Sequence, residues 1–181
     1  MLVVNLFGAP GSGKSTGAAY IFSQLKIAGV NAELVTEFVK GKVWENNEEV
    51  FKNQAYIFGE QSFKMSRCRD KVDVIVTDSP LLLSALYNSD EILGEEFNNV
   101  VYRVFNSYEN MNFFVERVKK YQPVGRLHTE EESDKIRDSL MSLLTTMNVS
   151  YKVVDGHVLG YHQIAINVLR RIQKEKNGTK A

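Results

Sequence analysis

Cysteine is almost absent from this chain of 181 residues, because Cys68 is the only one. An intramolecular disulfide and a zinc site built on several cysteines are therefore excluded. The histidines are also few, and His128, His157 and His162 are too scattered to form a metal site. No apolar run approaches the ~20 residues that a membrane-spanning helix needs. We expect no membrane partner.

Neither sign of charge dominates the sequence. Lys and Arg together number 22, and so do Asp and Glu, so no general basic field favours nucleic acid. A local basic patch is not excluded by this balance. Hydrophobic residues make up 44% and charged residues 24%, which is typical of a globular protein. The first residues enter a predicted strand directly and leave no room for a signal peptide, so we expect a cytoplasmic location.

Apolar segments typical of strands alternate with segments of helical periodicity along the whole chain. The predicted strands cover residues 2–7, 32–36, 72–77, 111–115 and 151–154. One predicted helix begins after Lys14, and three others cover residues 47–69, 94–107 and 164–172. A short helical piece is predicted after Pro80, and a further helix is capped by Thr129. Residues 156–160 are predicted as a turn, and the polar tail 174–181 as frayed. The pattern predicts a single α/β domain over residues 1–181, a five-stranded parallel sheet with helices on both faces.

The first predicted strand leads into a glycine-rich segment that fits the pattern G-x-x-x-x-G-K-[S/T]. The residues of this segment are Gly8, Ala9, Pro10, Gly11, Ser12, Gly13, Lys14, Ser15 and Thr16. A strand, a glycine loop and a helix in this order form a phosphate-binding P-loop. Glycines let backbone N–H groups turn towards phosphates, and the helix N-terminus adds partial positive charge.

This motif assigns a role to two side chains and predicts ATP and Mg²⁺ as ligands. Lys14 would reach the β- and γ-phosphates, and the Ser15 hydroxyl would ligate Mg²⁺. The sequence therefore predicts binding of a nucleoside triphosphate.

Two acidic residues follow other predicted strands, and ligands of such sheets bind beyond the carboxyl ends of the strands. Asp78 follows the strand 72–77 and matches the carboxylate that holds Mg²⁺ beside a P-loop. Its alternative role is to cap a helix that begins at Pro80. Glu37 ends the strand 32–36 and could orient and deprotonate an acceptor hydroxyl; its alternative role is that of a solvated loop charge. Trp44 either stacks on a base or packs in the core.

Residues 116–128 combine several cations with Pro123 and Gly125, and this composition is typical of a mobile lid. A closing lid would exclude water and bring Arg117 and Arg126 to the transferring phosphoryl group. The two arginines are favoured over the lysines because a planar guanidinium matches phosphate oxygens. A solvated basic loop is the alternative. A second basic cluster, from Lys64 to Lys71, is explained by a solvated helix end, with nucleic-acid contact as the alternative.

The residues of the glycine loop, Thr36–Val39 and Thr77–Pro80 resemble the nucleoside and nucleotide kinase branch of P-loop proteins. This branch includes the ATPase-like family that holds nicotinamide riboside kinase domains. Residues 117–126, followed by 129–133, resemble the lid of small phage-encoded P-loop kinases, among them the 5-hydroxymethyluracil DNA kinases.

The resemblance covers nearly the whole chain and implies several properties. The sheet order would be 2-3-1-4-5, Glu37 or Asp78 would act near the substrate hydroxyl, and the lid arginines would face ATP. Free deoxynucleoside kinases usually carry an Arg after the acid of the third strand, whereas Ser79 follows Asp78 here, and this departure speaks against such a substrate. A phage-encoded protein would act in the host cytoplasm.

The leading interpretation is an ATP-dependent kinase that phosphorylates a hydroxyl group, with 5-hydroxymethyluracil in DNA as the most specific acceptor. A second interpretation keeps this chemistry but takes a free nucleoside, such as nicotinamide riboside, or a nucleotide. A third interpretation is a P-loop ATPase or switch. The sequence has no N-K-x-D motif and no separate effector domain, and both absences argue against this interpretation.

Overall fold

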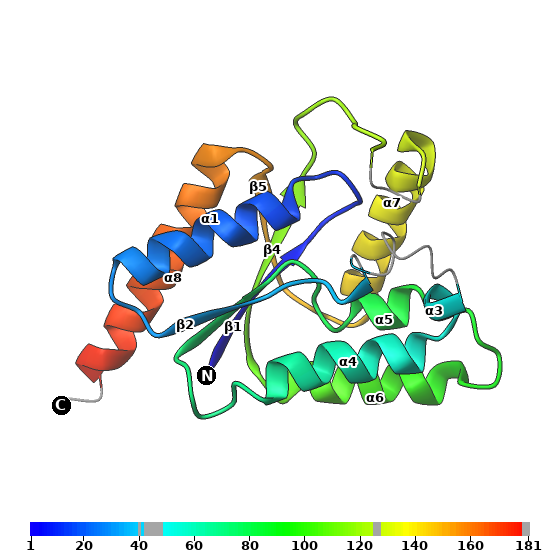
Figure 1. Cartoon of the computed structure of the whole chain (residues 1–181), viewed down its shortest axis with the longest axis horizontal. Coiled ribbons are helices and arrows are strands. Elements are labelled where there is room, and N and C mark those ends of the chain that lie inside the picture. Colours follow the sequence, from blue (N-terminus) through cyan, green and yellow to red (C-terminus); the bar gives the residue numbers. More distant parts are fainter. Residues whose placement is uncertain (40, 42–48, 125–127, 179–181) are drawn as a thin grey trace.

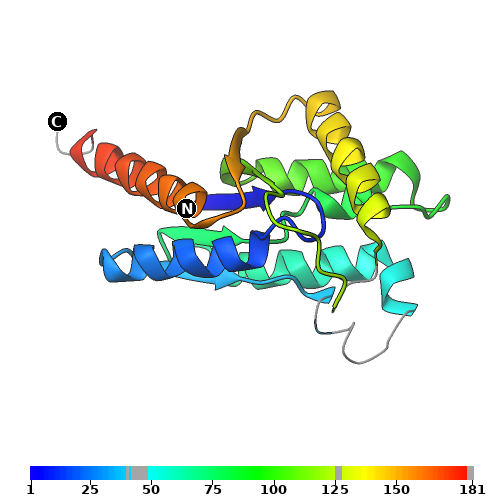
Figure 2. The same cartoon turned by 90° about the horizontal axis from the view of Figure 1, so that it is seen from above.

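The computed structural model of the chain describes residues 1–39, 41, 49–124 and 128–178. Figures 1 and 2 show a central sheet with helices packed on both of its faces. The amino-terminal strand runs through the middle of the sheet, and the C-terminal helix lies along one side.

Within the described residues, five parallel strands form one sheet of order β2-β3-β1-β4-β5. The strands are β1 (Leu2–Phe7), β2 (Ala32–Val35), β3 (Val74–Thr77), β4 (Glu109–Glu116) and β5 (Lys152–Asp155). Both the predicted fold class and the strand order are confirmed. All five carboxyl ends meet at one edge of the sheet, where the fold predicts the ligand site.

The helices form two layers. One face of the sheet carries α1 (Lys14–Ile27) and α8 (Val158–Gly178). The other face carries α4 (Gln54–Ser66), α5 (Leu83–Leu86), α6 (Gly94–Asn106) and α7 (Glu130–Thr146), and the short α3 (Glu49–Lys52) precedes α4.

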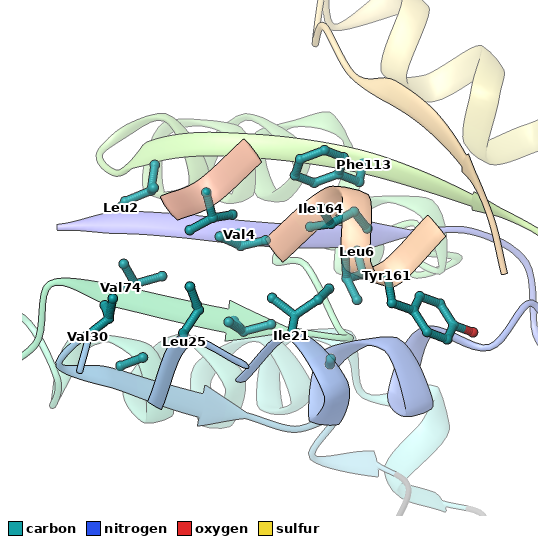
Figure 3. Close-up of a cluster of buried hydrophobic side chains, with 14 of the residues drawn as sticks. Leu2, Val4, Leu6, Ile21, Leu25, Val30, Val74, Phe113, Tyr161 and Ile164 are labelled. Atoms are coloured by element: carbon teal, nitrogen blue, oxygen red, sulfur yellow. The ribbon is translucent and has the colours of Figure 1, made fainter. Parts of the chain in front are cut away.

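A separate apolar cluster fills the space between the sheet and each helical layer. On the α1 and α8 side, Val4 and Leu6 of β1 meet Ile21 and Leu25 of α1 and Ile164 of α8, all fully buried (Figure 3). On the other side, the alternate β1 residues Val3 and Phe7 pack against α4 to α7. Because both faces of the sheet are covered, β1 is apolar at every position except Asn5.

The predicted helix 47–69 is wrong in one respect, because its described part contains a break. Helix α3 ends at Lys52, and Asn53 then adopts a non-helical backbone conformation, with φ −105° and ψ 82°. The Asn53 side chain accepts a hydrogen bond of 2.9 Å from the Tyr56 backbone N–H and so caps α4. Asparagine favours this capping role over a place inside a helix, which explains the break.

The C-terminal helix is longer than predicted at both ends. Helix α8 begins at Val158, inside the predicted turn 156–160, and continues to Gly178, inside the predicted frayed tail. Gly160 lies inside α8, and a glycine is required there because a Cβ would lie 2.1 Å from the Asp155 carbonyl oxygen. Near the other end, Arg171 pairs with Glu175 one turn on and with Glu109 at the start of β4. No helix in the described ranges has the length and apolar character needed to cross a membrane.

Candidate nucleotide-binding site

The glycine loop connects β1 to α1 in a conformation that only its glycines can adopt. Gly8, Gly11 and Gly13 have φ values of 141°, 84° and 98°, which L side chains rarely adopt. A Cβ on Gly8 would also lie 2.5 Å from the Val115 carbonyl oxygen, so the loop passes very close to β4. These constraints place the start of α1 beside the carboxyl ends of β1 and β4.

The Lys14 side chain turns back over the beginning of the loop. Its ammonium group donates hydrogen bonds of 2.7 Å to the Gly8 carbonyl and 3.0 Å to the Ala9 carbonyl. The positive charge is therefore held on the loop itself, and the flexible lysine stem allows it to move to a phosphate.

A tyrosine of α8, which the sequence analysis did not select, supports the loop from behind. Tyr161 is buried, and its hydroxyl donates a 3.1 Å hydrogen bond to the Gly13 carbonyl. Burial raises the pKa of the Tyr161 hydroxyl above its ordinary value. A Cβ on Gly17 would lie 2.7 Å from the Tyr161 ring, so the glycine in α1 permits this contact. Gly17 inside a helical segment was the signal in the sequence for a close approach.

Asp78 and Glu37 meet at the same edge of the sheet. Asp78 directly follows β3, is 4% exposed, and accepts a 3.0 Å hydrogen bond at Oδ1 from the Glu37 backbone N–H. Val35 at the end of β2 is paired with Thr77 at the end of β3, and this register brings the two acids together. The alternative in which Asp78 caps a helix at Pro80 is wrong, because α5 begins at Leu83 and has Leu82 as its N-cap.

Gln61 of α4 ties these two strand ends together and was also missed in the sequence. It is 3% exposed, its Oε1 accepts a 3.1 Å hydrogen bond from the Phe38 N–H, and its Nε2 donates one of 3.3 Å to the Ser79 carbonyl. A buried glutamine that bridges two loops holds the residues beside them, Glu37 and Asp78, in place.

The hydroxyl of Tyr87 is close enough to the partly buried Glu37 for the Glu37 charge to act on it. Partial burial of its hydroxyl and, to a lesser extent, the Glu37 charge raise the pKa of Tyr87 to about 12. The Tyr87 ring stacks on the His128 ring at a centroid distance of 6.5 Å and an angle of 27°. Tyr87 is therefore neutral near physiological pH.

Arg117, from the predicted lid, is held by α7. One of its terminal nitrogens lies 2.5 Å from Asp134 and 3.4 Å from Glu130, and its side chain is 16% exposed. The predicted capping box of α7 is confirmed, since Thr129 and Glu132 exchange hydrogen bonds of 2.7 and 3.2 Å. Arg126 and Trp44 lie outside the described residues, and their predicted roles stay predictions.

A second arginine, Arg137 of α7, also faces this edge of the sheet. Its guanidinium makes a two-pronged ion pair with Glu116, the last residue of β4, at 2.5 and 3.0 Å. This hydrogen-bonded pair raises the pKa of Arg137 above its ordinary value and fixes α7 against the sheet.

The donor set near the loop suits Mg²⁺ better than a metal held by the protein alone. No group of three or more His, Cys, Asp or Glu residues that could hold a metal ion occurs in the described part of the chain. Mg²⁺ is commonly held by one or two carboxylates together with phosphate oxygens and water. The hydroxyl of Ser15 and the buried carboxylate of Asp78 fit that arrangement.

The strand order and the glycine loop that joins β1 to α1 define the class: this is a P-loop nucleotide-binding domain. Within that class the chain belongs to the family described as AAA domain, whose model matches residues 3–159.

Comparison with solved structures supports the same fold. A structure titled "Crystal structure of NadR protein in complex with NR" is similar to 92% of this chain, with a TM-score of 0.70 and 16% sequence identity. This chain covers 50% of the chain in that structure, so it spans about half of its length. No curated protein sequence matches the chain significantly.

Proposed function

We propose that this protein is an ATP-dependent phosphotransferase that moves the γ-phosphoryl group to a hydroxyl acceptor. The observation that carries the proposal is the meeting of three elements at one edge of the sheet: the P-loop, the buried Asp78 carboxylate and Glu37, joined by the 3.0 Å hydrogen bond between the two acids. Phosphoryl transfer depends mainly on positioning and electrostatic stabilisation, which such an arrangement supplies.

On the nucleotide side, the loop residues 8–16 would hold the phosphates of ATP. Lys14 would leave the Gly8 and Ala9 carbonyls and bind the β- and γ-phosphates. Ser15 and Asp78 would hold Mg²⁺, which neutralises phosphate charge when bound.

On the acceptor side, Glu37 would orient the hydroxyl and accept its proton. Its backbone N–H is already bonded to Asp78, so its position relative to the proposed metal ligand is fixed. Because a kinase carboxylate in this role acts only on the acceptor, its removal affects turnover more than ATP binding.

The segment that follows β4 would supply Arg117 to the phosphates, as the lid hypothesis requires. Its guanidinium already lies at α7, whose Ser133 contacts the P-loop residue Pro10. Arg126, outside the described residues, remains the second proposed lid arginine.

For the acceptor, the fold neighbour solved with NR supports a free nucleoside such as nicotinamide riboside. The resemblance of the lid to phage kinases supports 5-hydroxymethyluracil in DNA. The basic cluster from Lys64 to Lys71 gives little support to the DNA candidate. Arg69 stacks at 4.6 Å on the Tyr108 ring and donates to Ser107, and with Lys71 it precedes β3, at the edge of the sheet opposite the P-loop.

Incubation with labelled ATP tests the proposal across a panel of acceptors: free nucleosides including nicotinamide riboside, nucleotides, ordinary DNA and DNA containing 5-hydroxymethyluracil. We expect label in one hydroxyl acceptor. Label in modified DNA alone, falling steeply with added salt, would select the DNA candidate, since phosphate contacts release counterions. ATP hydrolysis without any labelled acceptor would favour the ATPase or switch and contradict the kinase.

A further inference from the structure

Ser133, in the first turns of α7, connects two segments that the sequence separates widely. Its side chain is fully buried. The hydroxyl donates a 2.7 Å hydrogen bond to the Pro10 carbonyl in the P-loop. The same oxygen accepts a 3.4 Å hydrogen bond from Nη1 of Arg117. One hydroxyl therefore separates the Arg117 guanidinium from the phosphate-binding loop.

The other side of the guanidinium is held independently. Nη2 pairs with Asp134 at 2.5 Å and with Glu130 at 3.4 Å, and the guanidinium carbon lies 5.3 Å from the centre of the Tyr121 ring. The two carboxylates thus hold one terminal nitrogen, while the other is turned towards Ser133. This division leaves the Nη1 edge of Arg117 facing the loop.

On these contacts, and resting on the proposed function, we propose that Ser133 is a positioning residue that holds Arg117 beside the P-loop for the triphosphate. A serine hydroxyl has one proton to donate and two lone pairs. Because its proton goes to Pro10, a lone pair is directed to Arg117, and the resulting chain of hydrogen bonds strengthens each member. Asp134 completes the position by neutralising the guanidinium.

Positioning of this kind matters because a long arginine side chain otherwise samples many rotamers. Binding ATP to a freely moving Arg117 must order that side chain, whereas binding to one already held at the loop need not. The burial of Ser133 and the 16% exposure of the Arg117 side chain indicate that contacts within the protein hold this arginine in place.

A double-mutant cycle separates positioning from a general structural role. Ser133→Ala and Arg117→Ala are made singly and together, and the dissociation constant of a non-hydrolysable ATP analogue is measured for each. We expect each single variant to weaken binding about tenfold, the size expected of a hydrogen bond to a charged group. In the Arg117→Ala background, Ser133→Ala should then change binding by less than about twofold. Equal losses in both backgrounds would overturn the inference.

Two further variants of α7 sharpen this test. Glu131→Gln lies in the same helical turn but pairs with Lys135, at 2.8 Å, and should leave analogue binding unchanged. If Ser133→Ala fails to fold, Asp134→Asn replaces it in the double-mutant cycle with Arg117→Ala, because the Asp134 carboxylate is exposed. We expect weaker binding in Asp134→Asn. Tighter binding would show that Asp134 sequesters Arg117 from the nucleotide and would contradict the positioning role.

The readout also distinguishes this inference from the proposed function. A parent protein that binds the analogue but labels no acceptor contradicts the phosphotransferase, while the cycle still decides the role of Ser133. A parent that transfers phosphate but shows no coupling between Ser133 and Arg117 contradicts only this inference. A parent that binds no analogue contradicts both.

Discussion

Glu37 and Asp78 have separate roles in the proposed chemistry: Glu37 acts on the acceptor hydroxyl, and Asp78 holds Mg²⁺. Asp78 is buried and bonds to Glu37 through the Glu37 backbone N–H, so the carboxylate of Glu37 takes no part in that bond. The two carboxylates can therefore be tested separately.

Glu37→Gln should lower turnover at least ~100-fold, because it removes the group that accepts the proton of the acceptor. It should leave the KM for ATP almost unchanged, since the backbone bond to Asp78 survives. Steady-state kinetics with ATP and acceptor varied in turn measure both constants. Glu33→Gln, in β2 of the same segment, serves as the control. Loss of ATP binding with unchanged acceptor kinetics would reverse the assignment.

Asp78→Asn should raise the Mg²⁺ concentration required for half-maximal activity at least ~10-fold, because the amide preserves the shape but loses the charge. The asparagine oxygen can still accept from the Glu37 N–H, so folding should persist. A metal titration of activity, with circular dichroism as the check on folding, measures this. Asp73→Asn, an exposed residue at the other end of β3, should titrate like the parent. An unchanged titration for Asp78→Asn would remove it from the metal site.

At the scale of elements, α8 supports the P-loop through one tight contact. Tyr161 packs on Gly17 of α1 and bonds to the Gly13 carbonyl. The position of the loop thus depends on a residue that follows it by most of the length of the chain.

Gly17→Ala should destabilise the protein by about 1–3 kcal/mol, because the added methyl group would lie 2.7 Å from a buried ring. Thermal unfolding measures this as a lower Tm. Gly59→Ala in α4 is the matched control, since beyond its chain neighbours and the nearby backbone of its own helix nothing lies within 4 Å of the added methyl group, and the replacement should raise stability by up to ~1 kcal/mol. Equal Tm changes in the two variants would show that the contact between α1 and α8 is loose.

The sequence predicted elements well where one local pattern decided them. The strands appeared as apolar runs, the capping box predicted the start of α7 at Thr129, and a helix was predicted after Lys14, where α1 begins. The break at Asn53 was missed because the apolar periodicity continues across it. The start of α8 was missed because Gly160 suggests a turn until its close approach to Asp155 is known.

Site residues that act through tertiary packing could not be found this way. Gln61, Ser133 and Tyr161 each bond to a backbone group far away in the sequence, and nothing in their neighbours marks them. Asp78 and Glu37 were found because their position at strand ends is a local property. The alternative in which Asp78 caps a helix could be rejected only once the start of α5 at Leu83 was known.

At the scale of the whole molecule, the parallel sheet brings the P-loop, Asp78, Glu37 and α7 to one edge and leaves Arg69 and Lys71 at the other. A single domain of this kind binds its nucleotide and its acceptor at the same edge. We propose that this edge transfers phosphate from ATP, and Lys14 is the residue that this transfer needs most.

The most direct test is label transfer from ATP by Lys14→Ala, compared with the parent and with Lys26→Ala, an exposed lysine in the last turn of the same helix. Lys14→Ala should keep its fold but lose at least ~100-fold in turnover, because it loses a preorganised positive charge on the transferring group. Lys26→Ala should match the parent. Near-normal transfer by a folded Lys14→Ala protein would contradict phosphoryl transfer by this P-loop.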